Sequence, residues 1–419
     1  MVEIWLPYGD SEVCVRIPTA SLLDVIKPKD IDVPTDPREE IKSALKNPVG
    51  GKSIEDIAKS ETKVSIVLKE SFLQINRIVI CTLIDELRSA GIRDEDITLI
   101  IAHDPFKLSS KHDLPSDADL SERLKIIRHN HKNGENVYFG NSPGGIKFYL
   151  NRNFLEADVK ILVGTVEPHP IIGYTGGWEL IIPGIADTDS SNEIFKLGLD
   201  EITRRGRLKD NPVYEEISGA AEKVHVDLAL HIVMNGEFKV VKAFAGEAKK
   251  SFLEAVKFAD NIYRISVEDR ADVVFISPGG SYFDATFQES TLCLDAALDV
   301  LGRKKDLVLV AECSGGFGDK DFLEAFLKYP NSRLLRKDLE RSFSIPKLMA
   351  YRLMSILQRV DLSMVTAMPN YYVSKISDLK VARTANEAYR MLIESSRDKG
   401  KISFIPYGSL TIPSFSGKK

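Results

Sequence analysis

Short apolar runs that alternate with longer amphipathic segments are the feature that most constrains how this chain folds. Residues 64–68, 97–102 and 159–164 are runs of mostly branched apolar residues, as in strands buried on both faces. Residues 76–92, between the first two runs, have helical periodicity and end with a glycine stop signal. A strand, a helix and a strand in this order predict a parallel sheet covered by helices.

The same alternation starts again in the second half of the chain. Residues 271–280 are predicted to form a strand and a glycine turn, 287–302 a helix, and 306–318 another strand and turn. Before them, residues 226–246 contain two strand-like runs around Asn235-Gly236, which is a strong hairpin signal. The remaining predicted elements are a strand at 363–368, a helix at 384–400 and a last strand at 402–408.

The length of the chain indicates more than one domain. With 419 residues it exceeds the size of one ordinary hydrophobic core, so we expect two domains. We predict an N-terminal domain over residues 1–265 and a C-terminal α/β domain over 266–400, with 401–419 returning to the first domain. The predicted fold class is α/β: two domains with mainly parallel sheets flanked by helices, and a cleft between them.

Composition and charge exclude several classes of partner. Hydrophobic residues make up 43% and charged residues 28%, values typical of a globular protein, and the net charge is −5. The sequence has no basic excess that would indicate nucleic-acid binding and no apolar run long enough to cross a membrane. Residues 1–18 lack the pattern of a signal peptide, so we expect a cytoplasmic protein. The four cysteines show no Cys-x-x-Cys spacing, and no metal site is predicted from them.

Three predicted strands end in glycine-rich turns, within the segments 163–177, 276–284 and 310–319. Ligands of open parallel sheets bind at the carboxyl ends of strands, where glycine lets backbone amides approach an anion. A single turn of this kind is more simply explained as a tight connection, but three together predict a ligand site. We expect the amides near Gly279-Gly280 and Gly315-Gly316 to bind a small anion. No ATP or NAD fingerprint is present.

The seven histidines differ in their sequence context, and only one is singled out as catalytic; they are at positions 103, 112, 129, 131, 169, 225 and 231. His169 stands between two prolines after a buried strand, which suits an imidazole that transfers protons from a rigid turn. His225 and His231 lie in or beside a strand pattern and are interpreted as structural. His129 and His131 lie in a polar loop, where they face either a cleft or water.

The segment "EADVKILVGTVEPHPIIGYTGGWELIIPGIA" (156–186) resembles the signature of the nickel-pincer lactate racemase family. In that family a strand leads to Glu-Pro-His, then to Gly-Tyr/Phe-Ser-Gly-Gly-x-Lys and Pro-Gly. The segments "AFAGEAKKSF", "ADVVFISPGGSYFDATFQESTLCLDAA" and "FIPYGSLTIP" follow in the family's order, so the resemblance covers most of the chain.

The resemblance implies a racemase or epimerase of a small 2-hydroxy acid or sugar acid. Its cofactor would be a nickel pyridinium bis-thiocarboxylate mononucleotide, which is linked to a lysine and ligated by a histidine. His169 matches one of the family's two acid/base histidines. Other positions matched to cofactor or substrate contacts are Gly176 and Gly177 with Gly279 and Gly280 for the cofactor, and Tyr174 and Gln288 for the substrate.

Several chemical positions depart from the family pattern. Glu179 stands at the place of the cofactor-linking lysine, and no histidine occurs between 170 and 224 to ligate nickel. The family's Asp-x-Thr-Arg turn is replaced by "LKESFLQ" (68–74), Thr291 replaces a lysine, and His103 is out of register with a Gly-Thr-His turn. Covalent cofactor attachment is therefore predicted to be absent. Two functions stay open: a racemase-like isomerase with a nickel-pincer-type cofactor, or a diverged member without it that binds a small anion or performs metal-free chemistry.

Overall fold

The structure is a computed structural model that describes residues 1–59, 61–69, 77–108, 118–132, 136–200, 202–373, 376, 379–395 and 400–417. The chain forms two compact units. Unit 1 comprises Met1–Lys29, Pro168–Pro170 and Ile262–Lys419, and unit 2 comprises Asp30–Glu167 and Ile171–Asn261.

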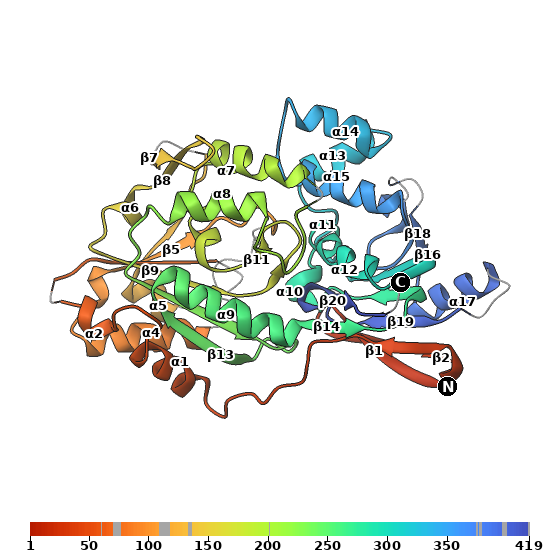
Figure 1. Cartoon of the computed structure of the whole chain (residues 1–419), viewed down its shortest axis with the longest axis horizontal. Helices are drawn as coiled ribbons and strands as arrows, with labels where there is room; N and C mark the ends of the chain where they lie inside the picture. Colours follow the sequence, from red (N-terminus) through yellow and green to blue (C-terminus); the bar gives the residue numbers. More distant parts are fainter. Residues whose placement is uncertain are drawn as a thin grey trace. The chain divides into compact units, whose positions relative to one another are not determined.

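A six-stranded sheet forms the centre of unit 2, and its strand order is β13-β12-β9-β4-β5-β6 (Figure 1). Every neighbouring pair is parallel except β12 with β13, which are antiparallel. The strands are β4 (Val64–Lys69), β5 (Ile97–Ala102), β6 (Lys125–Arg128), β9 (Val159–Thr165), β12 (Leu228–Met234) and β13 (Val240–Gly246).

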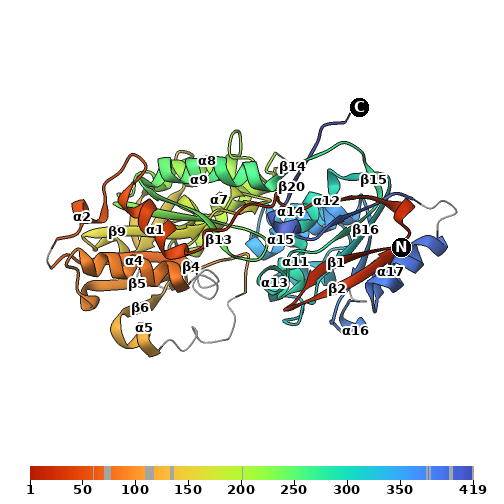
Figure 2. The same ribbon diagram turned by 90° about the horizontal axis from the view of Figure 1, so that it is seen from below.

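Alternating side chains of these strands fill a core on one face of the sheet. Val64, Ile66 and Leu68 of β4 pack in one cluster with Ile41 of helix α1 (Pro37–Lys46) and Leu83 of helix α4 (Arg77–Ser89). Each fully buried aliphatic side chain of this kind contributes about 2 kcal/mol through its removal from water. Figure 2 shows α4 on one side of the sheet and helices α8 and α9 on the other.

Local capping signals explain where two of these helices begin. Asp36 accepts a hydrogen bond from the amide of Arg38 (2.8 Å), and Pro37 occupies the first position of α1. Asn211 caps α8 in the same way, and this helix also starts with a proline. An Asn or Asp cap followed by proline satisfies a free amide and presets the first helical φ angle.

The other helices and strands of unit 2 connect and cover this sheet. The helices are α1 (Pro37–Lys46), α2 (Ile54–Ile57), α4 (Arg77–Ser89), α5 (Ala118–Arg123), α6 (Arg152–Leu155), α7 (Thr188–Phe195), α8 (Pro212–Ala221) and α9 (Ala248–Tyr263), with 3-10 turns η2 (Asp94–Asp96), η3 (Gly177–Leu180) and η4 (Lys196–Leu199). The short strands are β7 (Asn136–Asn141), β8 (Lys147–Asn151) and β11 (Gly173–Tyr174).

Unit 1 contains a second six-stranded sheet in the order β18-β17-β16-β15-β19-β3, and all its pairs are parallel. Its strands are β3 (Leu22–Val25), β15 (Ala271–Ile276), β16 (Leu301–Val310), β17 (Asp361–Val365), β18 (Lys380–Ala382) and β19 (Ile402–Ile405). Two parallel-sheet units flanked by helices confirm the predicted α/β class.

Helices and shorter strands complete unit 1, and Figure 1 shows the β1–β2 hairpin in red near helix α17 in blue. The helices are α10 (Ser281–Asp284), α11 (Phe287–Ser290), α12 (Leu294–Leu298), α13 (Lys320–Lys328), α14 (Ser332–Leu339), α15 (Ile345–Leu357), α16 (Asn370–Val373) and α17 (Ala385–Ser395), with 3-10 turns η1 (Thr19–Ser21), η5 (Thr291–Cys293) and η6 (Gly408–Leu410). The strands outside the large sheet are β1 (Val2–Tyr8), β2 (Ser11–Ile17), β10 (Pro168–His169), β14 (Arg264–Val267) and β20 (Ile412–Phe415).

The two units differ from the predicted domains at both ends of the chain. Residues 1–29 belong to unit 1, because β3 pairs with β19 and Leu6 and Val15 enter the same core as β15. The C-terminal segment also stays in unit 1, where β19 pairs with β15. Both corrections rest on hydrogen bonds between strands far apart in sequence, which local patterns do not reveal.

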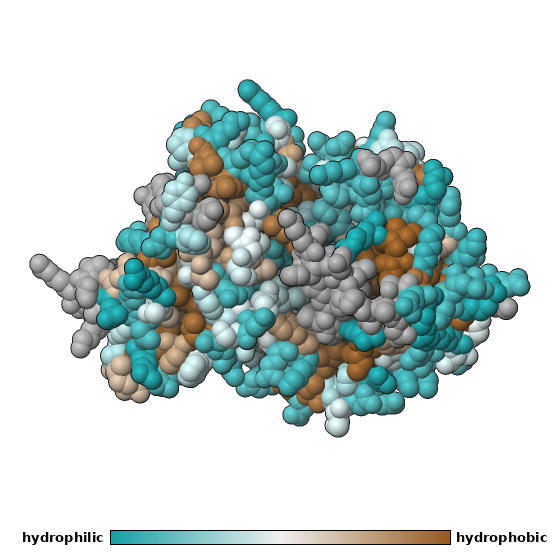
Figure 3. All heavy atoms as spheres, turned by 180° about the vertical axis from the view of Figure 1, so that it is seen from behind, coloured by the Kyte–Doolittle hydropathy of each residue, from teal (hydrophilic) through white to brown (hydrophobic). Residues whose placement is uncertain are grey.

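The surface agrees with a chain that buries its apolar residues inside each unit. Hydrophilic residues cover much of the face shown in Figure 3, with smaller hydrophobic patches between them. Over the described ranges, no helix combines the length and apolar character needed to cross a membrane.

Candidate functional site

Charged side chains gather at the carboxyl edge of the unit 2 sheet. Lys69 is the last residue of β4, His103 and Asp104 follow β5, and Glu167 follows β9. Glu179, from the 3-10 turn η3, joins them through an ion pair with Lys69. Since the three strands are parallel neighbours, their carboxyl ends meet at one edge, which is where open α/β sheets bind ligands.

Lys69 is shared between two buried carboxylates. Its Nζ lies 2.9 Å from Oδ2 of Asp104 and 2.9 Å from Oε2 of Glu179. The other oxygen of Glu179, Oε1, accepts a hydrogen bond of 2.9 Å from the amide of Gly176. The side chains of Lys69, Asp104 and Glu179 are only 14%, 13% and 5% exposed. Both oxygens of Glu179 therefore have partners inside the protein.

The pKa values follow from burial and from this sharing. Burial favours a neutral Lys69, but the charges of Asp104 and Glu179 outweigh it and raise the pKa of the ammonium above its usual range. Burial likewise opposes ionisation of Asp104, but Lys69 outweighs it and lowers the pKa of that carboxyl to about 2. For Glu179, burial is the largest effect and raises the pKa despite the charge of Lys69. For Glu167, burial is again the largest effect and raises the pKa despite the charges of Lys107 and Lys69.

The glycine pair before Glu179 is required by the backbone and by packing. Gly176 has φ of +84° and Gly177 of +56°, a region that side chains with a Cβ rarely adopt. A Cβ on Gly176 would lie 2.8 Å from the carbonyl oxygen of Thr165, and one on Gly177 would lie 2.9 Å from the Phe252 ring. The φ angles and these close contacts explain why glycine is needed at both positions. Contact of either glycine with a cofactor stays a prediction.

Two histidines stack beside the charged cluster. The rings of His103 and His131 are parallel within 7°, with centroids 3.8 Å apart. Burial is the main reason why the pKa of His103 is lowered to about 4, and the neighbouring His131 lowers it further. Burial also lowers the pKa of His131. The Thr188 hydroxyl donates its one proton to the backbone carbonyl of His131 (3.1 Å). The contact of 2.6 Å between this hydroxyl and Nδ1 of His131 is therefore one in which Nδ1 donates and the hydroxyl accepts. The neutral His131 ring then has Nε2 as its acceptor.

His129, by contrast, has a structural role. Its Nε2 lies 2.9 Å from the carbonyl oxygen of Ala186, so that nitrogen carries the proton. Its Nδ1 then accepts from the side-chain amide of Asn151 at 3.1 Å. Burial lowers the pKa of His129, which keeps this ring neutral.

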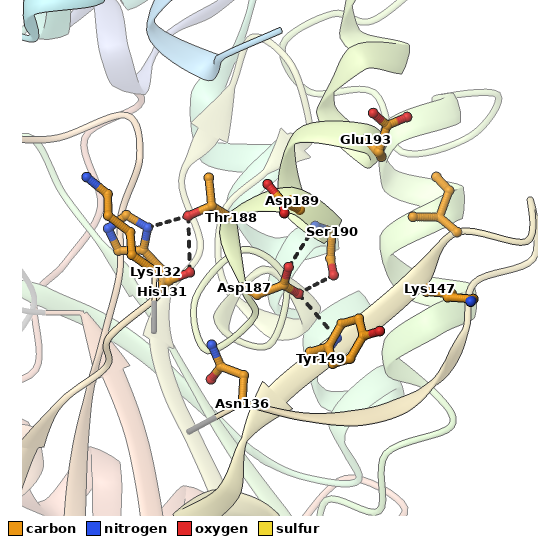
Figure 4. Close-up of a pocket in the computed structure, with 11 residues that line it drawn as sticks. His131, Lys132, Asn136, Lys147, Tyr149, Asp187, Thr188, Asp189, Ser190 and Glu193 are labelled. Atoms are coloured by element: carbon orange, nitrogen blue, oxygen red, sulfur yellow. Dashed lines mark hydrogen bonds between the residues drawn. The ribbon is translucent and has the colours of Figure 1, made fainter. Parts of the chain in front are cut away.

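A groove of about 910 Å³ opens beside the histidine stack in unit 2 (Figure 4). Figure 4 shows Asp187 turned toward Ser190 and Tyr149. Asp187 caps helix α7, because its Oδ2 accepts a hydrogen bond of 3.1 Å from the Ser190 amide. Lys132 and Lys147 lie on opposite sides of Asp187 in this view. The groove is lined by His131, Lys132, Asn136, Ile146, Lys147, Tyr149, Asp187, Thr188, Asp189, Ser190 and Glu193.

The predicted catalytic and substrate residues in or near unit 1 are buried. His169 lies in β10 and belongs to unit 1, and it is 6% exposed. Gln288 accepts a 2.8 Å hydrogen bond from the Asp319 amide at Oε1, and its Nε2 contacts Sδ of Met349 (3.2 Å). The hydroxyl of Tyr174, in unit 2, donates to a neighbouring carboxylate, that of Asp260. Direct substrate contact by these residues stays a prediction.

The turns predicted to bind an anion already use several amides within unit 1. The Gly279 amide donates to the Ser277 hydroxyl (3.2 Å), and the Gly315 amide donates to the Ala285 carbonyl (2.8 Å). After Gly280, the Ser281 amide donates to the carbonyl of Gly9 at the tip of the β1–β2 hairpin (2.9 Å). The hydrogen bonds expected for an anion are therefore made by the protein itself at these amides.

No sequence pattern singled out Lys69, Asp104 or Glu167 as site residues. The available signal was that each polar residue ends or follows a buried apolar strand. Two other predictions fall outside the described residues, namely those on His112 and on most of the segment 68–74 that replaces the Asp-x-Thr-Arg turn.

Fold and site together define an α/β protein with a candidate catalytic or binding centre at the carboxyl edge of a parallel sheet. Residues 8–199 match the family described as the lactate racemase N-terminal domain. The chain is 27% identical to a lactate racemase of Thermoanaerobacterium thermosaccharolyticum, covering 97% of this chain and 98% of that protein. Its identity to a lactate racemase of Lactiplantibacillus plantarum is 21%, covering 88% and 89%.

Solved structures give the same result. The lactate racemase apoprotein from T. thermosaccharolyticum superposes with a TM-score of 0.88 at 26% identity, covering 99% of this chain and all of that one. A protein from Thermotoga maritima shares the fold with a TM-score of 0.67 at 16% identity, covering 90% of this chain and 98% of that one. The chain is therefore similar to lactate racemases in sequence and in fold along almost its whole length.

The glycine turn provides the first testable prediction. Gly176 and Gly145 have nearly the same φ, +84° and +85°, but a Cβ on Gly145 would meet no atom within 4 Å. Gly145→Ala is expected to cost roughly 1 kcal/mol of stability from φ strain alone, and Gly176→Ala about 3 kcal/mol because of the added overlap with Thr165. Calorimetric melting of both variants measures the difference. Equal losses would contradict a steric role for Gly176.

Removal of the Lys69 ammonium provides the second testable prediction. Lys69→Met leaves Asp104 and Glu179 buried without a cation, and we expect a loss of about 3 kcal/mol at pH 7. Lys42→Met removes a surface pair with Glu39 and serves as the control, with an expected loss under about 1 kcal/mol.

The loss should depend on pH in a defined direction. In the wild type the lowered pKa of Asp104 stabilises the fold above about pH 4, its ordinary value, and this contribution disappears as pH falls toward 2. The difference between wild type and Lys69→Met should therefore shrink over that range in chemical denaturation. A constant difference would show that Lys69 acts by packing and not by charge.

Proposed function

We propose that this chain is an isomerase that racemises or epimerises a small 2-hydroxy acid in the cytoplasm. The observation that carries the proposal is the extent of the similarity to a lactate racemase, which reaches 97% of this chain and 98% of that protein. The similarity therefore spans both units and is not limited to one shared domain. The substrate could be lactate or another member of the 2-hydroxy acid class.

Inversion of a hydroxyl-bearing carbon requires groups that take and return protons. His169 supports this role through its position after the apolar strand β9 and between two prolines, which restrict the backbone. A buried carboxyl, Glu167, stands two residues before it. Both lie where the family carries its Glu-Pro-His motif.

The residues present do not fit a covalently attached nickel-pincer cofactor. The family resemblance implies a lysine amine at position 179, whereas this chain has a carboxylate whose oxygens contact Lys69 and the Gly176 amide. A carboxylate offers no nucleophilic nitrogen for the link. Lys69 does not replace it, because its two carboxylate partners hold it as an ammonium. We therefore derive no reaction step through this cofactor.

This mismatch supports a second candidate function. A family member without the linked cofactor would still bind a small carboxylate anion, or would act on it by metal-free proton transfer. The observation that favours this alternative is the buried ion pair between Lys69 and Glu179, which occupies the attachment position with an internal contact. Activity and adduct measurements separate the two candidates.

The isomerase proposal is tested with single enantiomers of a panel of 2-hydroxy acids, followed by chiral chromatography. We expect the opposite configuration to appear for at least one acid and to disappear with His169→Ala, without a change in melting temperature. His225→Ala is the matched control, because this histidine is exposed and its Nε2 lies 2.9 Å from Oδ1 of Asp227. A panel in which no acid changes configuration would reject the isomerase and favour the anion-binding alternative.

The attachment position is tested by intact mass and nickel analysis of protein produced together with cofactor-making enzymes. We expect no mononucleotide adduct on wild-type protein, and removal of any bound cofactor by dialysis. Glu179→Lys alone should lower the melting temperature, because it places a second ammonium against Lys69 and removes the acceptor of the Gly176 amide. A stable adduct on the wild type would refute this reading of Glu179.

A further inference from the structure

Glu167 carries a buried carboxyl oxygen that no described residue satisfies with a hydrogen bond. The residue lies two positions after the last residue of the apolar strand β9 and is 6% exposed. Its Oε1 is buried and has no hydrogen-bond partner among the described residues. An unsatisfied buried polar group costs stability, so such an atom in a native fold requires an explanation.

The backbone of Glu167 is firmly held, so a loose loop is not the explanation. Its amide donates to the hydroxyl of Thr175 (2.9 Å), and its carbonyl accepts from the Thr175 amide (2.8 Å). The same hydroxyl donates to the carbonyl of Thr165 (3.0 Å). Thr175 thus fixes the main chain on which this carboxyl stands.

Burial favours the protonated form of Glu167. It is the largest effect on the pKa of this carboxyl and raises it. The charges of Lys107 and Lys69 and a hydrogen bond with Thr165 lower the pKa in part, and the charge of Glu179 raises it. Lys69 is already paired with Asp104 and Glu179, so little of its charge is left to stabilise another anion. A protonated carboxyl carries an O–H donor, which is the kind of group that binds an oxygen acceptor.

We propose that the protonated carboxyl of Glu167 donates a hydrogen bond from Oε1 to the carboxylate of a bound 2-hydroxy acid. The class of ligand rests on the proposed function, but the inference does not require that the ligand be isomerised. A hydrogen bond to an ionised acceptor is stronger than a neutral one, and a neutral donor accepts an anion without like-charge repulsion. Glu167 is thereby a binding residue for the acid group of the substrate.

This role predicts how binding depends on pH. The bound state needs the proton on Glu167, so affinity is full below the pKa of this residue and is lost as pH rises through it. Above that point the affinity should fall by roughly tenfold for each pH unit, since the ionised carboxyl has no proton to donate. The ligand stays ionised throughout, because small carboxylic acids of this kind titrate near pH 4.

The experiment is titration calorimetry with L-lactate and with propionate, which has the same carboxylate but no hydroxyl, between pH 5.5 and 9. Wild-type protein should bind both with the decline described above. Glu167→Gln keeps an N–H donor that does not titrate, so it should bind at pH 5.5 within a few fold of wild type and show no decline. Glu167→Leu removes the donor and should weaken binding about tenfold to hundredfold. Glu254→Gln, an exposed position on α9, is the control.

The outcomes separate this inference from the proposed function. A Glu167→Gln variant with the wild-type decline, a folded Glu167→Leu variant with wild-type affinity, or no binding to wild type at pH 5.5 would each overturn the inference. The melting temperature of each variant checks that it is folded. If propionate and lactate bind with the predicted pH dependence but no acid changes configuration, the inference on Glu167 stands and only the isomerase proposal is rejected.

Discussion

The interaction on which the candidate site depends is the buried ammonium of Lys69 between Asp104 and Glu179. It joins the ends of β4 and β5 to the turn η3, and it determines which neighbouring acids are ionised. Asp104 is held as an anion, and both oxygens of Glu179 accept hydrogen bonds, from Lys69 and from the Gly176 amide, whereas burial favours a protonated Glu167. Carboxyls of different character thus lie at one sheet edge, a pattern that enzymes use to separate acid from base roles.

The same interaction changes how the family relationship is interpreted. The scaffold agrees with lactate racemases along almost the whole chain, but position 179 carries a carboxylate that is committed to Lys69 and to Gly176. A fold maintains its core and turns more strictly than its chemistry, so homology supports the substrate class more firmly than the cofactor. The site favours chemistry built on buried carboxyls and a neutral histidine pair over attachment to an amine.

Much of the fold could be predicted from the sequence, and the reasons are local. The strands at 64–68 and 97–102 and the α/β class are confirmed, because apolar runs and helical periodicity report burial directly. The helix predicted over 287–302 is instead divided into α11, η5 and α12 before β16 begins at Leu301. The cleft predicted between the two domains stays a prediction, and so do the ligand contacts of His169 and Gln288.

Sequence alone determined buried strands such as 64–68 and 97–102, local caps such as Asp36-Pro37, and the glycines that turn the chain, because these depend on residues close to each other. Tertiary structure alone decided that Lys69 meets Asp104 and Glu179, which are 35 and 110 positions away (104 − 69 and 179 − 69). Strand order is set by hydrogen bonds and burial between distant segments, and no local pattern encodes them. The charge state of a buried carboxyl follows from that order, because its pKa depends on which cation the fold places beside it.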